Sequence, residues 1–526
     1  MTKRRPAERG DRAEGPGLPA ERSGGHASTG SRQQPSISAD GGSRWTLIAA
    51  ISLVTLLVLL DDTAVSVALP TMQRELGFGY EAQEWVVNSY TLALAVFTLL
   101  AGHLADRIGA SRIFLVGLAV FIAGSLLTGL TTSVSLLIAF RTVQGTGAAL
   151  VAPAALALIA GAFSDRRRGT ALGIWAGISG SALGIGPIVG AYVTETLGWS
   201  WIFLLNVPLG AVAWLVAWRV LPATGVRRPQ GRPDLIGAAL SAVALLGLLL
   251  GLSRGNDWGW TSPATLGLLA LVPLGLALFV VHERRTSHPL VDLRLFANRV
   301  FTGATVVTLF STAVMCSLFF FLALYLQTVV GLTPLASGAA LLPLTLTIVL
   351  VAPIAGRLSD RFGTRALVVG GTALLGVGLL GMSGLRSSSD LVGLMLWLAL
   401  AGFGIALART PTTSAALGSA GEGAYGMASS VVNTAQAAGL ALGISIMSVI
   451  LTAVGPGAAF SAGSAEAHHE AFIAGFSTGL LVNATIALAT ALLAFLMFAD
   501  PTRRMRTPTR VGRGGAGRRT GPGSGA

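Results

Sequence analysis

The chain carries the stretch LVLLDDTAVSVALP at residues 57–70, where two adjacent carboxylates, Asp61 and Asp62, interrupt an apolar run from Trp45 to Leu69. A helix over that run is long enough to cross the roughly 30 Å hydrocarbon layer of a membrane. Carboxylates at that depth are costly and persist mainly where they face a cavity or a partner. We therefore interpret Asp61 as a proton or cation site inside a membrane. The alternative is a carboxylate that satisfies backbone groups at a kink or a helix end.

The composition of the chain indicates that it contains many membrane-spanning helices. Its 526 residues are 52% hydrophobic and only 11% charged, and apolar stretches of about 20 residues, the length of a membrane-spanning helix, recur along it. Read against charged residues and Pro/Gly punctuation, the sequence predicts fourteen spans, at 45–69, 85–105, 112–130, 134–161, 169–193, 200–221, 234–253, 263–282, 301–327, 334–356, 366–385, 389–408, 424–453 and 472–498. The predicted fold class is an all-α polytopic membrane protein.

Two residue types exclude several classes of function. Cys316 is the only cysteine, so no intrachain disulfide and no cysteine-based redox or zinc motif can form. Lys3 is the only lysine, and a Walker-type ATPase needs a lysine after its glycine-rich turn. His468, His469 and Glu470 are interpreted as solvated loop residues rather than as a metal site, because no spacing supports one. We expect no enzyme, no metal and no cofactor, with a proton gradient as the source of energy.

The placement of charge predicts the topology. The formal net charge is +13, but the arginines lie in short loops and two tails rather than on a face interleaved with aromatics, so nucleic-acid binding is not expected. The interhelical loops carry 17 Lys or Arg on the side of the tails, Arg409 among them, and 3 on the other side. Positive loops remain in the cytoplasm. Both termini are therefore expected there, with the protein in the plasma membrane.

An internal repeat divides the chain into two halves. The turn GHLADRIGASR at 102–112 follows the second span, and GRLSDRFGTR at 356–365 follows the tenth. Helices 1–6 and 9–14 are therefore expected to form two parallel six-helix repeats, with helices 7 and 8 inserted between them. The expected organisation is a disordered tail at 1–44, a first half at 45–221, a linker with two extra helices at 222–299, a second half at 300–498 and a disordered basic tail at 499–526.

Several of these motifs resemble those of the major facilitator superfamily, specifically its fourteen-helix drug:proton antiporter branch, over nearly all of Trp45 to Phe498. The two turns resemble the superfamily's cytoplasmic signature, and LDDT at 60–63 with ALP at 68–70 resembles the branch's first-helix motif. Further similarities are LIAFRTVQGTGAA at 137–149, GPIVG at 186–190, WSWIFLLNVP at 199–208 and YLQ at 325–327. The resemblance implies the major facilitator fold and proton-driven multidrug efflux.

The sequence departs from the family's pattern in two places. Ala110 and Ser111 stand where the cytoplasmic turn usually carries basic residues, which weakens its contacts in one conformational state. Ala182 and Ala191 replace usual glycines of the helix 5 motif. Alanine is small enough to preserve close packing, so little functional loss is expected from that change.

Arg141 is a basic residue well inside a predicted span. It lies about eight residues, or ~12 Å, from the external end of helix 4, a depth similar to that of Asp61. A guanidinium keeps its charge whereas a carboxyl can take up a proton, so a pair of the two works as a proton switch; the alternative is a static ion pair that joins helices. In the family this arginine is associated with proton coupling. Asp62 points about 100° away around the helix, which leaves it as a local modulator.

A structural role is favoured for the two repeated turns. Their aspartates and arginines lie at the membrane edge, where such residues cap helices and form charge relays that hold the cytoplasmic side shut in one state. Glycines in the fifth span let another helix approach closely. The residues expected to act in conformational gating are Gly102, Asp106, Arg107, Gly109, Arg112, Gly186, Pro187, Gly190, Asp360 and Arg361.

The substrate cavity is expected to be mostly apolar, because the helices of the second half carry almost no charge in their interiors. Such a cavity suits lipophilic or amphipathic molecules better than sugars or phosphates. Helix packing is the alternative role for each of its polar candidates. These candidates are Asn88, Tyr90, Gln144, Tyr325, Gln327, Asn433 and Gln436.

Together these observations predict a proton-coupled antiporter that exports lipophilic drugs or antibiotics by alternating access, and that works as a monomer in the lipid bilayer. One alternative is a dedicated exporter of a single endogenous metabolite, such as a self-made antibiotic. A further alternative is a membrane sensor that keeps the fold without transporting.

Overall fold

The computed structural model describes residues 41–163, 165–221, 234–287, 289–384, 391–421, 424–454 and 465–498. The two predicted tails lie outside these residues, except that the first helix already begins at Gly41. Within the described ranges all regular structure is helical, in the order α1 (Gly41–Leu76), α2 (Tyr80–Ile108), α3 (Ala110–Leu130), α4 (Val134–Ala162), α5 (Asp165–Gly180), α6 (Ala182–Leu197), α7 (Ser200–Val220), α8 (Leu235–Trp258), α9 (Pro263–Arg285), η1 (Leu293–Ala297), α10 (Arg299–Thr328), α11 (Pro334–Ala340), α12 (Leu342–Phe362), α13 (Thr364–Ser383), α14 (Leu391–Ser419), α15 (Tyr425–Val454) and α16 (Ala465–Met497).

The described helices include 14 that are long and apolar enough to cross a membrane, which confirms the predicted all-α polytopic architecture. The fifth span is made of two helices, since α5 ends at Gly180 and α6 begins at Ala182. The short helix α11 precedes α12 in the tenth span. Neither interruption was predicted, because an apolar run does not reveal where the hydrogen-bond ladder of a helix breaks.

The twelfth span differs most from its prediction. The sequence placed its end at residue 408 and Arg409 in a loop, but α14 continues through Pro411 to Ser419. Proline removes one backbone donor from a helix, and the hydroxyls of the next two residues bond to nearby carbonyls. Thr412 donates to Ala408 O at 2.7 Å and Thr413 to Arg409 O at 3.1 Å. Arg409 therefore lies inside a membrane-spanning helix, and its assignment to a loop was wrong.

The polar segment at the start of the last span is also helical. His468, His469 and Glu470 were interpreted as loop residues, but α16 begins at Ala465 and includes them. The neighbouring alanines and glutamates favour helix, which explains why the helix extends beyond its apolar stretch.

Side-chain caps determine where several helices begin. Asp234, Ser262, Asn298 and Thr333 each accept a hydrogen bond from a backbone N–H in the first turn of α8, α9, α10 and α11. Such a cap satisfies a donor that has no partner within the helix and stabilises the helix by about 1 kcal/mol.

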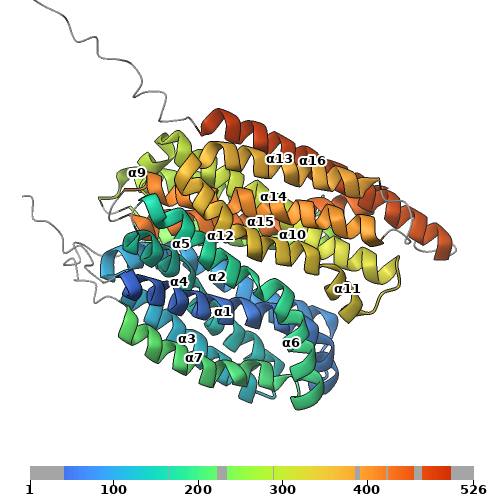
Figure 1. The fold of residues 1–526 in the computed structure, drawn as a ribbon. Helices are drawn as coiled ribbons and strands as arrows, with labels where there is room; N and C mark the ends of the chain where they lie inside the picture. The colour runs from blue at the N-terminus through green and yellow to red at the C-terminus, as the bar shows by residue number, and fades with distance from the viewer. Residues whose placement is uncertain are drawn as a thin grey trace, which may run out of the picture. The chain divides into compact units, whose positions relative to one another are not determined.

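The helices form two repeats that meet along two matching contacts. In the first repeat α1 packs against α6 and α7, and α3 packs against α4 and α7; in the second, α10 packs against α15 and α16, and α13 packs against α14 and α16. The repeats contact each other where α2 packs on α15 and where α5 packs on α12, as can be followed in Figure 1. The inserted helices α8 and α9 pack on each other.

Two glycines make the turns that follow α2 and α12. Gly109 has φ 110° and Gly363 has φ 85°, values that side chains other than glycine rarely adopt. Each glycine lets one helix end and the next begin immediately, with α3 starting at Ala110 and α13 at Thr364. The repeated sequence therefore corresponds to a repeated backbone turn.

Candidate functional site

The buried ion pair predicted from the sequence is present between α1 and α4. Arg141 Nη1 lies 3.0 Å from Asp61 Oδ2, and both side chains have 0% of their surface exposed. Separating two charges in such a place is expensive, since a charge left alone in a low-dielectric interior loses both water and partner. The pair therefore holds α1 and α4 together as long as Asp61 is ionised.

A polar chain from two further helices reaches the second oxygen of Asp61. Asn206 Nδ2, on α7, donates to Asp61 Oδ1 at 2.5 Å and lies 3.1 Å from Ser125 Oγ on α3. The Ser125 hydroxyl in turn donates to Phe203 O at 2.9 Å. Both Asn206 and Ser125 are buried. The ionised carboxylate thus has a donor at each oxygen, from Arg141 on one side and from Asn206 on the other.

Not every donor nitrogen of Arg141 has a hydrogen-bond partner. Nε donates to Val86 O at 3.3 Å, and Nη1 also donates to Gln144 Oε1 at 2.9 Å. The guanidinium carbon lies 4.2 Å from the centre of the Tyr90 ring, within the range of a cation–π contact. Among the described residues Nη2 has no hydrogen-bond partner. Arg141 is therefore a charged group inside the bundle whose Nη2 has no hydrogen-bond acceptor among the described residues.

Asp62 lies near that nitrogen of Arg141. Its Oδ1 is 3.8 Å from Arg141 Nη2, and 42% of its side chain is exposed. The distance exceeds that of a hydrogen bond. As the helical geometry predicted, the two aspartates are not equivalent: Asp61 is enclosed and bonded, whereas Asp62 is open and only near.

Glycines of α6 bring that helix against α1 beside the two aspartates. A Cβ atom at Gly186 would lie 1.8 Å from Thr63 Oγ1, and one at Gly190 would lie 2.8 Å from Ala64 Cα. Neither position has room for a larger residue. The Thr63 hydroxyl lies 3.3 Å from Ala182 O at the start of α6. The helices α1 and α6 are therefore in close contact beside Asp61.

The first repeated turn joins the two halves on the side of the bundle where α1 begins and α16 ends, here called the tail side. Asp106, in the last turn of α2, accepts hydrogen bonds from the backbone N–H groups of Gly426 at 2.6 Å and Met427 at 2.7 Å, in the first turn of α15. A carboxylate at a helix N-terminus satisfies free donors and complements the helix dipole. A Cβ at Gly102 would lie 2.3 Å from Gly426 O, so glycine permits this approach.

The second repeated turn makes the same contact in the reverse direction. Asp360, at the end of α12, accepts hydrogen bonds from the N–H groups of Gly169 and Thr170 on α5, each at 2.9 Å, and from the Thr170 hydroxyl at 2.7 Å. A Cβ at Gly356 would lie 2.1 Å from Gly169 O. Each Gly-xxx-Asp pair thus makes a hydrogen-bonded contact between the two halves. We call these two contacts the Asp106 lock and the Asp360 lock.

Arg112 and Arg361 are not among the hydrogen-bond donors named above for the two locks. Arg112 is exposed, and the Arg361 guanidinium stacks on its own neighbour, 5.1 Å from the Phe362 ring centre. The cationic contact across the halves comes instead from Arg168, which sequence reasoning did not single out. Arg168 Nη2 donates to the Tyr425 hydroxyl at 3.1 Å and lies over that ring.

Comparison with known proteins assigns the family. The sequence model described as the Major Facilitator Superfamily matches residues 51–444 and 344–520. The chain belongs to the major facilitator superfamily. It is 32% identical over 502 residues to the tetracenomycin C resistance and export protein of Streptomyces glaucescens, with 88% of this chain and 93% of that protein covered. It is 36% identical over 419 residues to the multidrug resistance protein Stp of Mycobacterium tuberculosis, with 78% and 76% covered.

A solved structure supports the fold of this superfamily member. The proton:xylose symporter XylE matches with a TM-score of 0.61 and 14% identity, covering 88% of this chain and 97% of that one. At that identity the likeness shows the fold alone. The superfamily is one of transporters, and the relatives by sequence are named for resistance and export, so the chain is a multi-pass membrane transporter related to drug and antibiotic exporters.

In this superfamily protein the residues predicted for the substrate cavity are dispersed. Tyr90 and Gln144 contact Arg141 and belong to the ion-pair cluster. Tyr325 stacks on Phe476 with ring centres 4.9 Å apart. Asn88 is half-buried and Gln327 is exposed. Two of these five, Tyr90 and Gln144, therefore lie together at the ion pair.

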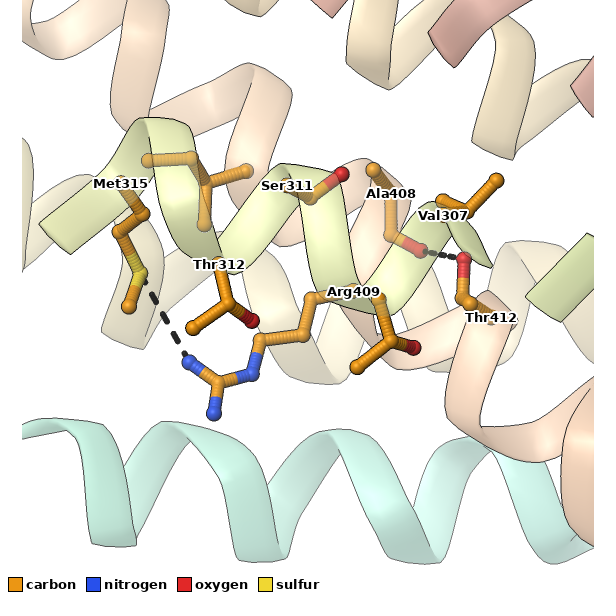
Figure 2. Close-up of a pocket in the computed structure, with 9 residues that line it drawn as sticks. Val307, Ser311, Thr312, Met315, Ala408, Arg409 and Thr412 are labelled. Carbon is orange, nitrogen blue, oxygen red and sulfur yellow. Dashed lines mark hydrogen bonds between the residues drawn. The ribbon is translucent and has the colours of Figure 1, made fainter. Parts of the chain in front are cut away.

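The last two cavity candidates lie on α15, near a residue that the sequence misplaced. Gln436 Oε1 lies 3.4 Å from Arg409 Nη2, and Asn433 Nδ2 is buried without a hydrogen-bond partner among the described residues. Figure 2 shows a small cavity where Arg409 extends from α14 along α10 toward Met315. The signal that could have found this site was a lone arginine between the apolar stretch 391–408 and the polar stretch 410–414.

Proposed function

We propose that this protein is a proton-coupled antiporter that exports lipophilic or amphipathic compounds by alternating access. The observation that carries the proposal is the enclosed Asp61–Arg141 pair, with its 3.0 Å contact inside the membrane-spanning bundle. An arginine stays charged under all ordinary conditions, whereas a carboxyl group can bind and release a proton. Protonation of Asp61 removes the partner of Arg141, and this change in charge is the event that couples proton movement to a change in conformation.

The contacts of α1 provide a route from that event to the locks. α1 contacts α5 as well as α6, and Gly186 and Gly190 keep α6 directly against Thr63 and Ala64. The beginning of α5 carries the N–H groups that Asp360 accepts. A displacement of α1 on protonation therefore reaches the Asp360 lock through two helices that belong to one span. Opening of both locks would expose the space between the halves to the tail side, which we assign to the cytoplasm.

Purified protein in proteoliposomes tests this mechanism. An imposed pH gradient should drive accumulation of ethidium, and addition of ethidium should in turn move protons, detected with a pH-sensitive dye inside the vesicles. Asp61→Asn should abolish the proton movement because an amide does not titrate. Asp62→Asn is the matched control and should retain coupled transport. Ethidium-dependent proton movement that persists in Asp61→Asn would overturn the proposal.

A dedicated exporter of a single endogenous compound is the second candidate. It is favoured by the similarity to a relative named for one antibiotic, tetracenomycin C, over 93% of that relative, whereas the similarity to the multidrug resistance protein Stp favours a broad substrate range. Susceptibility of a drug-sensitive host separates the two. A multidrug exporter raises tolerance to several unrelated compounds, each increase being removed by a protonophore, whereas a dedicated exporter changes few.

A further inference from the structure

Arg409 is a half-buried residue in the interior of a helix of the second half. It belongs to α14 and stands about 15 Å from the end of that helix at Ser419, given a rise of 1.5 Å per residue. Its side chain lines a small cavity between α10 and α14, together with the hydroxyl residues Ser311 and Thr312 and the apolar residue Met315 (Figure 2). A cation at this depth is costly and marks a functional site by default.

The two helices that line the cavity, α10 and α14, supply no carboxylate to neutralise this charge. The polar contacts of Arg409 in the described structure are neutral: Gln436 Oε1 at 3.4 Å and Met315 Sδ at 3.7 Å. The sequences of α10, α14 and α15 contain no aspartate or glutamate. An arginine does not lose its proton to escape the cost of burial. The cavity therefore holds a permanent positive charge and offers it no negative partner.

The other half of the molecule shows what such an arginine requires. In the first repeat, α4 carries Arg141 and α1 supplies Asp61. The second repeat places α14 and α10 in the corresponding positions, but α10 presents hydroxyl groups to the cavity instead of a carboxylate. Ser311 Oγ is buried there with no hydrogen-bond partner among the described residues. In Figure 2, however, the Ser311 hydroxyl points away from the Arg409 guanidinium, whereas the Thr312 hydroxyl lies on the same side of α10 as the guanidinium.

We propose that this cavity binds the anionic group of the transported compound, so that the substrates of the exporter include lipophilic monocarboxylic acids. The Arg409 guanidinium and the Thr312 hydroxyl donate hydrogen bonds to the carboxylate within this cavity. One arginine balances one negative charge, which favours a monoanion over a phosphate dianion. The cavity takes the acid group alone, and the rest of the molecule lies toward the interface of the halves. This inference rests on the export function proposed above.

A binding measurement tests this substrate class without relying on transport. Radiolabelled naphthoate and naphthamide have the same shape, but only naphthoate is charged; each is bound to the full-length protein in lipid nanodiscs, with empty nanodiscs subtracted. The wild type should bind naphthoate about ten-fold or more tightly than naphthamide, the amount expected for hydrogen bonds to a charged group. Arg409→Gln should reduce that preference to near unity. Arg409→Lys should retain part of it, because the charge remains while the planar fork of donors is lost.

Two further variants keep the test decisive. Arg219→Gln removes an exposed arginine from the last turn of α7 and should leave the preference unchanged. Thr312→Val should weaken naphthoate binding several-fold without affecting naphthamide, and it removes only one hydroxyl if Arg409→Gln fails to fold. Equal binding of the two probes by the wild type, absence of naphthoate binding, or a preference that survives in both Arg409→Gln and Thr312→Val would each overturn the inference. Failure of the export function would appear separately, as loss of gradient-driven ethidium transport with the naphthoate preference intact.

Discussion

The Arg141 guanidinium contacts three helices of the first half: α1, α2 and its own helix α4. It contacts Asp61 of α1, the Val86 carbonyl and the Tyr90 ring of α2, and Gln144 of its own helix. Removing one member of a buried ion pair costs about 3–5 kcal/mol, because the other charge is left without a partner, whereas replacing both members is often nearly neutral. The pair should therefore respond to mutation as a unit.

A double-mutant cycle measures this coupling. Arg141→Gln should lower the thermal unfolding midpoint of the purified protein strongly, and the addition of Asp61→Asn should restore much of the loss. The coupling energy should exceed about 1 kcal/mol, as expected for residues in direct contact. The same cycle between Arg141 and the exposed Asp62 should give a much smaller value. Additive losses for the Asp61 cycle would contradict a paired, ionised Asp61 in the resting protein.

Asn206 is predicted to stabilise the ionised form of the site. Asn206→Ala removes the donor at Asp61 Oδ1, and the loss of a hydrogen bond to a charged group costs about 1.5–3 kcal/mol. Ser125→Ala removes only the neutral neighbour of that amide, so its cost should be about 1 kcal/mol. Thermal unfolding of the two variants in detergent checks the order. A larger loss in Ser125→Ala would place the main role of the chain of hydrogen bonds in packing α3 on α7.

Sequence reasoning found some of these residues and missed others for physical reasons. Asp61 and Arg141 could be paired because charges inside apolar runs are rare and their depths along two helices can be compared. Asn206 was seen only as part of a motif, since the rotation of α7 that aims it at Asp61 depends on packing. Arg409 was misplaced because a basic residue followed by Thr-Pro-Thr is typical of a loop. In the structure α14 continues through Pro411, and the Thr412 and Thr413 hydroxyls donate to Ala408 O and Arg409 O.

At the scale of helices, the two locks are predicted to control access from the tail side. Asp106→Asn removes the charge that two backbone N–H groups of α15 bind, so the contact between α2 and α15 should open more often. Ser430, which has 0% of its surface exposed, lies on that contact beside Gly102. In a Cys316→Ser background, Ser430→Cys should react with a soluble maleimide several-fold faster when Asp106→Asn is also present.

A matched aspartate controls for the loss of charge alone. Asp257, in the last turn of α8, lies 3.6 Å from Arg254 Nη1 of its own helix and is not among the residues of either lock. Asp257→Asn should leave the labelling rate of Ser430→Cys unchanged. Equal acceleration by both variants would show that net charge, rather than the Asp106 lock, determines access.

The inserted helix pair has its own contact between helices. Asp234 caps α8, and its Oδ1 lies 2.9 Å from His282 Nε2 on α9. Asp234→Ala should therefore cost more stability than Ser262→Ala, which removes the cap of α9 alone; each cap is worth about 1 kcal/mol. The comparison is made by thermal unfolding. Transport per folded molecule should remain close to wild type in both variants, since these helices lie outside the six-helix repeats, and a selective loss of transport would argue against that role.

At the scale of the whole molecule, the repeat was predictable, whereas its interface was not. The Gly-xxx-Asp pairs at 102–106 and 356–360 could be read directly from the sequence, and they identified two related halves. Their partners at Gly169 and Gly426 lie in ordinary-looking stretches, and only the crossing of α5 over α12 and of α2 over α15 brings them together. The sequence repeat therefore identifies the glycines and aspartates of the two contacts, but only the long-range packing of the helices identifies the backbone groups that they bind.

The orientation of the molecule is the last property that charge predicts. Placing Arg409 inside α14 removes one residue from the positive loops of the tail side, and the excess over the opposite side remains large. Both termini should therefore lie in the cytoplasm. Alkaline phosphatase fused after Trp260, in the turn between α8 and α9, should be active, and the same enzyme fused after Thr286, beyond α9, should be inactive. A fluorescent protein that requires the cytoplasm to fold should be bright when fused after Thr286 and dark after Trp260. The opposite pattern would invert the assignment of the tail side and place the locks on the outer face, where they would gate release instead of entry.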